Sequence, residues 1–304
     1  MSLDENNVIP YLMENPAMSG IAVRLASKAG LPGADHLYQQ QFDSMLAQGN
    51  YTEAAKIAAN SPRGFLRTPE TINRFKMAPQ TGQMSVILQY FGMLLDKGSL
   101  NRYESVELVR PVLQQNRKHL LEKWMRENKL EASEELGDIV RPHDMNLALQ
   151  IYLQANVPHK VVAGFAETGQ FDKILAYTKR VGYQPDYTQL LQHIVRVNPE
   201  KGAEFATQLV NEDSGALVDL DRVVDVFLSQ NMIQQATSFL LDALKDNKPE
   251  HGHLQTRLLE MNLINAPQVA DAILGNEIFT YYDKARISQL CENAGLIQRA
   301  LENT

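Results

Sequence analysis

A short turn-like pattern recurs along the chain at intervals of about thirty residues. In each copy an apolar segment ends, a glycine or asparagine follows, and a new apolar segment begins within a few residues. The turn residues are Gly98, Asn128, Asn156, Asn198, Asn231, Asn262 and Gly295. Such a period fits one helical hairpin, with two helices of about 11 residues and two short turns. A lone hairpin leaves an apolar face uncovered, so consecutive hairpins are expected to stack into an α-solenoid.

One interval, between Asn156 and Asn198, is longer than the others. It contains a further turn at Thr168-Gly169-Gln170, which predicts an additional short helix pair or a slipped register. The period is close to that of tetratricopeptide repeats, but their tryptophan-containing signature is absent. Spacing alone therefore predicts a helical repeat without fixing its type.

Apolar residues between the turns have helical spacing. One stripe at i, i+3, i+4, i+7 and i+8 consists of Leu220, Val223, Val224, Phe227 and Leu228. Residues 236–244 and 266–274 repeat this spacing, and no sustained alternation typical of strands is found. The sequence therefore predicts an all-α fold, an elongated α-α superhelix of stacked helical hairpins.

Helix start and stop signals agree with this prediction. Side chains placed to cap helix N-termini are Asn50, Thr68, Asp186 and Asn198, and two of them precede a proline at the first helical position. Asn50 and Glu53 have the spacing of a capping box. Glycines placed to end helices in the left-handed conformation are Gly137, Gly182 and Gly275.

The first part of the chain has shorter helical segments than the rest. They lie near residues 8–15, 19–29, 34–48 and 52–60, and prolines and glycines in 61–85 surround one further short helix. We therefore predict a zigzag of short linker helices over residues 1–85. Residues 86–304 are predicted to form the α-hairpin solenoid.

Composition restricts the class of protein. Apolar residues make up 44% of the 304 positions, enough for a continuous core, and the formal net charge of −7 argues against nucleic-acid binding. No apolar run approaches about 18 residues, so direct membrane insertion is not expected. The first residues lack the features of a secretory signal. The single cysteine, Cys291, excludes an internal disulfide and fits a cytoplasmic location.

Motifs for catalysis or cofactor binding are missing from the sequence. It has no glycine-rich phosphate loop, no His-Glu-x-x-His and no Gly-x-Ser-x-Gly. His251 and His253 come closest to a metal pair, but no cysteine or further histidine lies nearby, which favours solvated side chains. Cys291 lies on an apolar helical stripe and is predicted to be a buried small residue. We expect no enzyme, no cofactor and no metal site.

Clusters of charge also have a structural interpretation. The carboxylates of 131–135 suit the first turn of a helix, and the basic residues of 117–126 suit a solvated helix face. The alternative function considered for such an array is a generic α-solenoid adaptor that binds peptides on a concave face. Its signature would be a stripe of Asn, Lys, Arg or aromatic residues at the hairpin period, and the sequence shows none.

Several long segments resemble the clathrin heavy chain family. They are residues 48–56, 66–72, 110–115, 120–124, 155–158, 165–170, 254–263 and 266–276. The resemblance implies the region after the N-terminal propeller, namely the helical linker, the ankle and the start of the distal leg. It places the first clathrin heavy-chain repeat in the C-terminal third, and implies that the chain is a segment of a longer polypeptide.

The same resemblance implies a structural function. A heavy-chain leg is a scaffold of the polyhedral coat of clathrin-coated pits and vesicles, which serve endocytosis and intracellular protein transport. The expected partners are other heavy-chain legs, on the cytoplasmic face of the membrane, and the isolated segment is expected to be monomeric. Light chains and adaptors are expected to bind only through regions that this chain lacks.

The resemblance also implies a finer function. In animal members of the family, the ankle is a docking surface for a helix of a phosphorylated coiled-coil protein. The matching positions are Leu149 and Leu153, one helical turn apart, and the basic residue Arg180. An alternative is that both leucines belong to the solenoid core, because residues 145–153 are apolar nearly all round.

Overall fold

A computed structural model describes residues 34–80, 82 and 84–304. These residues form eighteen α-helices and three short 3-10 helices, and none of them lies in a strand. The all-α prediction is therefore confirmed for the described part of the chain. The helices expected near residues 8–15 and 19–29 lie outside it, whereas those expected near 34–48 and 52–60 are present as α3 (Ala34–Ala47) and α4 (Tyr51–Ala59).

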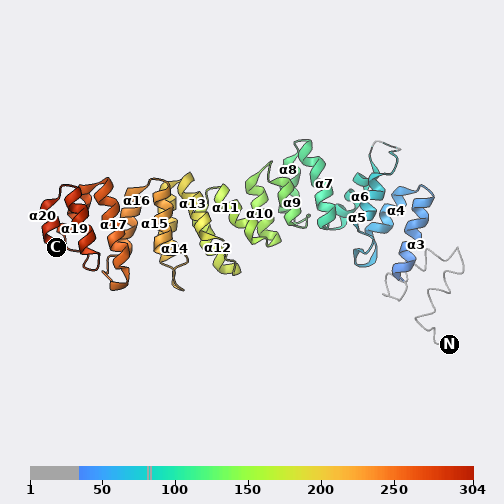
Figure 1. Ribbon diagram of the computed structural model, residues 1–304. Coiled ribbons are helices and arrows are strands. Elements are labelled where there is room, and N and C mark those ends of the chain that lie inside the picture. The colour runs from blue at the N-terminus through green and yellow to red at the C-terminus, as the bar shows by residue number, and fades with distance from the viewer. Residues whose placement is uncertain (1–33, 81, 83) are drawn as a thin grey trace, which may run out of the picture. The chain divides into compact units, whose positions relative to one another are not determined.

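The chain divides into two compact units, Met1–Val161 and Val162–Thr304. Beyond α3 and α4, the helices of the first unit are η2 (Pro62–Gly64), α5 (Pro69–Lys76), α6 (Val86–Lys97), α7 (Arg102–Gln114), α8 (Lys118–Arg126), α9 (Glu134–Val140) and α10 (Met145–Ala155). Helix α11 (Pro158–Glu167) contains the boundary. Consecutive helices pack as hairpins, α7 with α8 and α9 with α10, and α7 also contacts α9 of the next hairpin (Figure 1).

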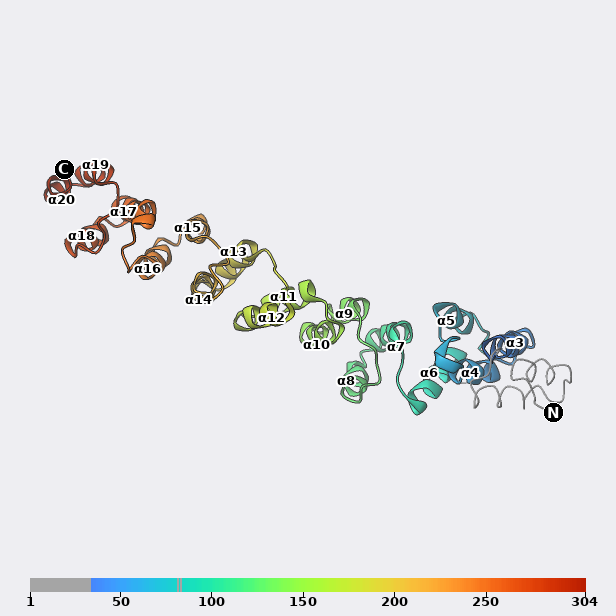
Figure 2. The ribbon, with the colours of Figure 1, turned by 90° about the horizontal axis from the view of Figure 1, so that it is seen from below.

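The second unit repeats this arrangement. Its helices are η3 (Phe171–Lys173), α12 (Ile174–Val181), α13 (Tyr187–Val197), α14 (Pro199–Val210), α15 (Leu220–Ser229), α16 (Ile233–Ala243), η4 (Pro249–His251), α17 (Gly252–Asn265), α18 (Pro267–Gly275), α19 (Lys284–Asn293) and α20 (Ile297–Glu302). Helix α13 contacts α15 and α14 contacts α16, so successive hairpins stack in two layers (Figure 2). The prediction of stacked helical hairpins is confirmed.

Four of the seven recurring turn residues share one geometry. Asn128, Asn156, Asn231 and Gly295 adopt positive φ angles of 54°, 56°, 57° and 80°, one or two residues after the end of a helix. After Asn156, the amide of Val157 donates to the carbonyl of Tyr152 at 3.2 Å, which is the six-residue closure of a Schellman motif. The pattern seen in the sequence is therefore a repeated helix-ending motif.

Two of the predicted turn positions are wrong. Asn262 lies inside α17 and is only 2% exposed, because its side chain hydrogen-bonds Thr237 and the carbonyl of Leu258. Gly137 lies inside α9, where a Cβ would approach Tyr152 Cε1 to 2.3 Å, so the residue serves close packing.

Of the other two glycines predicted to end helices in the left-handed conformation, Gly182 does so and Gly275 does not. Gly275 is the last residue of α18, and the positive φ falls two residues later at Glu277. Gly182 does end α12 in the left-handed conformation, with a φ of 70°. Gly169 adds another left-handed turn, so the long interval contains extra helices, as predicted.

The predicted N-terminal caps are confirmed. The side chain of Thr68 accepts a hydrogen bond from the amide of Thr71 at 3.3 Å, and those of Asn50, Asp186 and Asn198 do the same at their helices. The stripe on α15 is also confirmed, since Val223, Val224 and Phe227 are fully buried. Capping and periodicity together position each helix in its hairpin.

Candidate functional site

Helix α10 separates a buried core from an open groove. Its core side presents Leu149, Ile151 and Tyr152, which are at most 4% exposed. Gln150 and Gln154, one helical turn apart, are exposed and line the groove. The helix therefore has one side fixed by packing and one side available for contacts.

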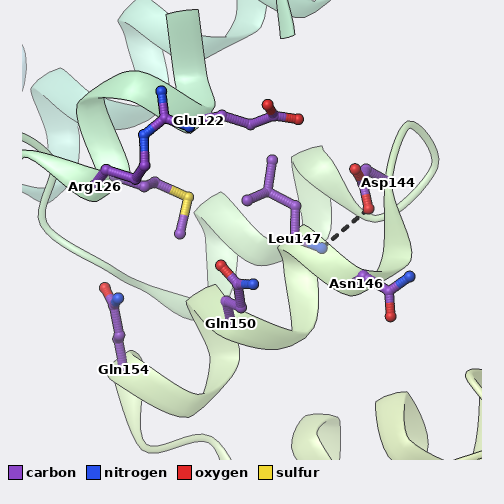
Figure 3. Close-up of a pocket in the computed structure, with 8 residues that line it drawn as sticks. Glu122, Arg126, Asp144, Asn146, Leu147, Gln150 and Gln154 are labelled. Atoms are coloured by element: carbon purple, nitrogen blue, oxygen red, sulfur yellow. Dashed lines mark hydrogen bonds between the residues drawn. The ribbon is translucent and has the colours of Figure 1, made fainter. Parts of the chain in front are cut away.

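The groove lies between α8 and α10, both in the first unit, and encloses about 450 Å³. Figure 3 shows Gln150 and Gln154 projecting from α10 toward α8, and Arg126 and Glu122 projecting from α8. The complete lining is Glu122, Met125, Arg126, Asp144, Asn146, Leu147, Gln150 and Gln154. Most of these side chains are polar, so the groove offers hydrogen bonds rather than an apolar surface.

Asp144 fixes one end of this groove. Its Oδ1 accepts a hydrogen bond from the Leu147 amide at 3.0 Å, which caps α10 (Figure 3). Its Oδ2 lies 3.1 Å from Lys118 Nζ on α8. Desolvation alone would raise the pKa of the Asp144 carboxyl, but these two donors outweigh it and lower the pKa. The carboxylate therefore stays ionised and ties the start of α10 to α8.

The residues predicted for docking a coiled-coil helix differ in exposure. Leu149 is 4% exposed and belongs to the core, whereas Leu153 is partly buried at the end of α10. Arg180 is exposed on α12, with its guanidinium 5.6 Å from the ring centroid of Tyr177. Leu149 and Leu153 belong to the first unit and Arg180 to the second, and docking at these residues stays a prediction.

A buried ionic cluster lies at the junction of α5, α6 and α7. Glu104 on α7 is fully buried, and its two carboxylate oxygens accept from Arg67 Nη2 at 2.6 Å and Nε at 3.1 Å. The hydroxyl of Tyr90 and the amide of Asn101 also donate to this carboxylate. Burial raises the pKa of the Tyr90 hydroxyl, and the Glu104 carboxylate beside it acts in the same direction.

Several ion pairs link a helix to the helix two further along the chain. Those in the first unit are Lys76–Glu107, Arg110–Glu135, Lys118–Asp144 and Lys160–Asp138. Those in the second are Asp221–His253, Asp221–Arg257, Glu260–Arg286 and Asp271–Arg299. Each exposed pair contributes little alone, but together they favour one register between neighbouring hairpins.

His251, His253 and Cys291 are the residues that came closest to a metal-binding or reactive group in the sequence. His253 lies 2.9 Å from Asp221, and His251 ends the 3-10 helix η4. Cys291 is fully buried, and burial raises the pKa of its thiol. Within residues 34–80, 82 and 84–304 there is no group of three or more His, Cys, Asp or Glu side chains that could hold a metal ion. No helix in this part of the chain has the length and hydropathy needed to cross a bilayer.

Comparisons with known proteins identify the family. Residues 30–94 match the family model described as Clathrin-H-link, and residues 211–304 match the model described as Region in Clathrin and VPS. The chain is 59% identical over 303 residues to "Probable clathrin heavy chain" of Schizosaccharomyces pombe, covering 99% of this chain. It is 55% identical over 308 residues to "Clathrin heavy chain" of Drosophila melanogaster, and 51% identical over 304 residues to that of Dictyostelium discoideum.

The chain belongs to the clathrin heavy chain family. It spans 18% of the length of each of these relatives. The segments that resembled clathrin heavy chains contain residues that build the hairpins. Residues 165–170 include the left-handed Gly169, and residues 254–263 supply Leu254, Leu258 and Leu259 to the core.

Two features of the chain were missed in the sequence. The Glu104 cluster was one, although Asn101 and Glu104 have capping-box spacing and do form that box. The amide-lined groove was the other, because exposed glutamines look like ordinary surface residues until α8 and α10 are placed side by side.

Proposed function

We propose that this chain is a structural segment of a clathrin heavy chain leg, and that it acts as a scaffold in the coat of clathrin-coated vesicles and pits. The observation that carries the proposal is the identity of 51% to 59% to clathrin heavy chains over 99% to 100% of the chain. The stacked hairpins support a mechanical role, since stiffness in such an array comes from every interface between neighbours. This role requires no catalysis.

The proposed organisation follows the family's regions. Residues 1–85 are assigned to the linker helices, and residues 86–304 to the ankle and the beginning of the distal leg. The match of the linker model to residues 30–94 supports the first assignment. The match of the repeat model to residues 211–304 supports a clathrin repeat in the C-terminal third.

The proposed partners are other heavy-chain legs, met on the cytoplasmic face of coated pits and vesicles. Charged side chains on the outer surfaces of the helices favour many weak polar contacts over one apolar anchor. Such contacts let free legs remain apart and assemble only when many form together. The isolated segment is accordingly expected to be monomeric in dilute solution.

The test is a chimera in the Schizosaccharomyces pombe heavy chain, with the matching region replaced by this chain. We expect the chimera to form sedimentable coats and to restore uptake of a membrane dye in cells that lack the native heavy chain. A tetratricopeptide array of equal length in the same place is the matched control, and it should restore neither. A chimera that is expressed and folded but fails like the control would refute the proposal.

A further inference from the structure

The groove between α8 and α10 presents side chains that no other described residue satisfies. Gln150, Gln154 and Arg126 are exposed, and none of their side chains has a hydrogen bond or ion pair with another described residue. All three line the groove, with Gln150 and Gln154 projecting from α10 toward α8 and Arg126 on α8 (Figure 3). The position of the groove is fixed by the packing of α7 with α8, of α9 with α10, and of α7 with α9.

We propose that this groove binds an extended peptide through its main chain. A carboxamide supplies an N–H donor and a carbonyl acceptor from one side chain, which is the pair that an unpaired peptide unit requires. Gln150 and Gln154 are about 6 Å apart along α10, and alternate residues of an extended chain are about 6.7 Å apart. Two flexible glutamines therefore bridge two peptide units on the same side of the bound segment.

The chemistry of the groove favours this ligand over others. A helical partner has already satisfied its own main chain, so only its side chains remain to bond the carboxamides. A nucleic acid requires a basic surface, whereas this groove also contains Glu122 and Asp144. The α8 wall has nine residues, about 13.5 Å, which matches about four residues of extended chain.

The charges along α8 predict the sequence of the bound segment. Glu122 and Arg126 are one turn apart on α8, with Glu122 nearer the Asp144 end of the groove and Arg126 at the Gln154 end (Figure 3). An extended peptide with a basic and an acidic side chain two residues apart places each charge opposite its complement. The occupant is therefore an extended segment with a basic-x-acidic or acidic-x-basic pattern, according to its direction.

A second groove, in the other unit, provides an internal comparison. It lies between α14 and α16 and is lined by Ala203, Glu204, Thr207, Gln234, Gln235, Ser238, Phe239 and Asp242. It has glutamines but no cation, and both of its charged groups are acidic. It is therefore not expected to select a peptide with an acidic side chain.

The test measures binding of defined peptides to the complete 304-residue chain by fluorescence anisotropy. The probe is a fluorescein-labelled decapeptide of glycine and serine with Lys-Ala-Asp at its centre. Two related probes are a peptide methylated at the amide nitrogens of that centre and a peptide with serine in place of both charged residues. We expect the first probe to bind with a Kd on the order of 1 mM.

Matched variants assign the binding to the groove. Replacing both Gln150 and Gln154 with Ala should raise the Kd about tenfold, and methylation of the probe should do the same. Arg126→Ala should weaken binding of the charged probe but not of the serine probe. The control, Gln189→Ala with Gln192→Ala, removes two exposed glutamines from α13 and should change the Kd less than twofold.

Several results would overturn the proposal. One is the absence of binding by the charged probe at 10 mM, and another is equal binding of the methylated probe. Unchanged affinity in the Gln150 and Gln154 double variant would exclude this groove, even if replacing Gln234 and Gln235 abolished binding. Circular dichroism and thermal unfolding of each variant separate loss of binding from loss of fold.

Discussion

Replacing Glu104 with Ala should destabilise the first unit more than any exposed charge replacement. The change leaves the guanidinium of Arg67, whose side chain is 22% exposed, without its bidentate partner. It also leaves the buried hydroxyl of Tyr90 and the amide of Asn101 without their acceptor. Removal of one partner from a buried pair costs about 3–5 kcal/mol, because the remaining charge stays desolvated.

The control for this change lies one turn further along the same helix. Glu107 pairs with Lys76 at 3.1 Å, but the two side chains are 28% and 47% exposed. Pairs of this kind contribute about 0–1 kcal/mol, so Glu107→Ala should have little effect. The difference between the two variants isolates the contribution of burial.

The single tryptophan makes the measurement specific to this unit. Trp124 lies in the first unit and packs against the core cluster that contains Tyr90, so its fluorescence reports unfolding there. The free energy of unfolding falls by about 2 kcal/mol for each 1 M of urea. A loss of about 4 kcal/mol in that free energy therefore lowers the urea midpoint of unfolding by about 2 M. A midpoint for Glu104→Ala that equals the Glu107→Ala midpoint would refute the reasoning.

A second comparison tests whether charge or shape matters. Replacing both Arg67 and Glu104 with Met removes the pair without leaving a buried charge, and should restore a large part of the lost stability. Retention of the full defect in the double variant would show that the hydrogen bonds to Tyr90 and Asn101 dominate.

Four further predictions follow from single residues. Asn156→Gly should preserve the midpoint of unfolding, while Asn156→Ala should cost about 1 kcal/mol, because only the second strains the left-handed turn. Cys291 should react with a thiol reagent only after urea unfolding, and rapid labelling of the native chain would contradict its burial. The lowered pKa of Asp144 stabilises the fold above its unfolded value of about 3.9, so the urea midpoint should fall as pH drops below 4, and less so in Asp144→Asn. For the docking that the family resemblance implies, Leu153→Ala should weaken binding of a phosphorylated coiled-coil peptide about tenfold, and calorimetry showing unchanged affinity would exclude this residue.

The sequence predicted the turns well where local geometry decides them. Asn128, Asn156 and Asn231 end helices in a conformation that asparagine tolerates, so the pattern can be recognised without tertiary information. Asn262 has the same local pattern, but the hydroxyl of Thr237 on α16 offers its side chain a partner within the helix. Gly137 was misjudged for a related reason, since Tyr152 is not its neighbour in sequence.

The candidate site was less accessible from the sequence. Arg67 and Glu104 are 37 residues apart, and helical spacing gives no indication that they meet. Leu149 was open to two interpretations because its helix is apolar nearly all round, and only packing shows that it is buried. The groove depends on the spacing of α8 and α10, which local patterns do not determine.

The short sequence separation of the contacts between hairpins has a consequence for folding during synthesis of the chain. The ion pairs and hydrogen bonds between hairpins join residues 22 to 37 positions apart, for example Lys160 to Asp138 and Arg67 to Glu104. During translation, each hairpin therefore finds its partners once about one further hairpin has left the ribosome. At about 5–20 residues per second that wait lasts a few seconds, so apolar surface is exposed only near the growing end.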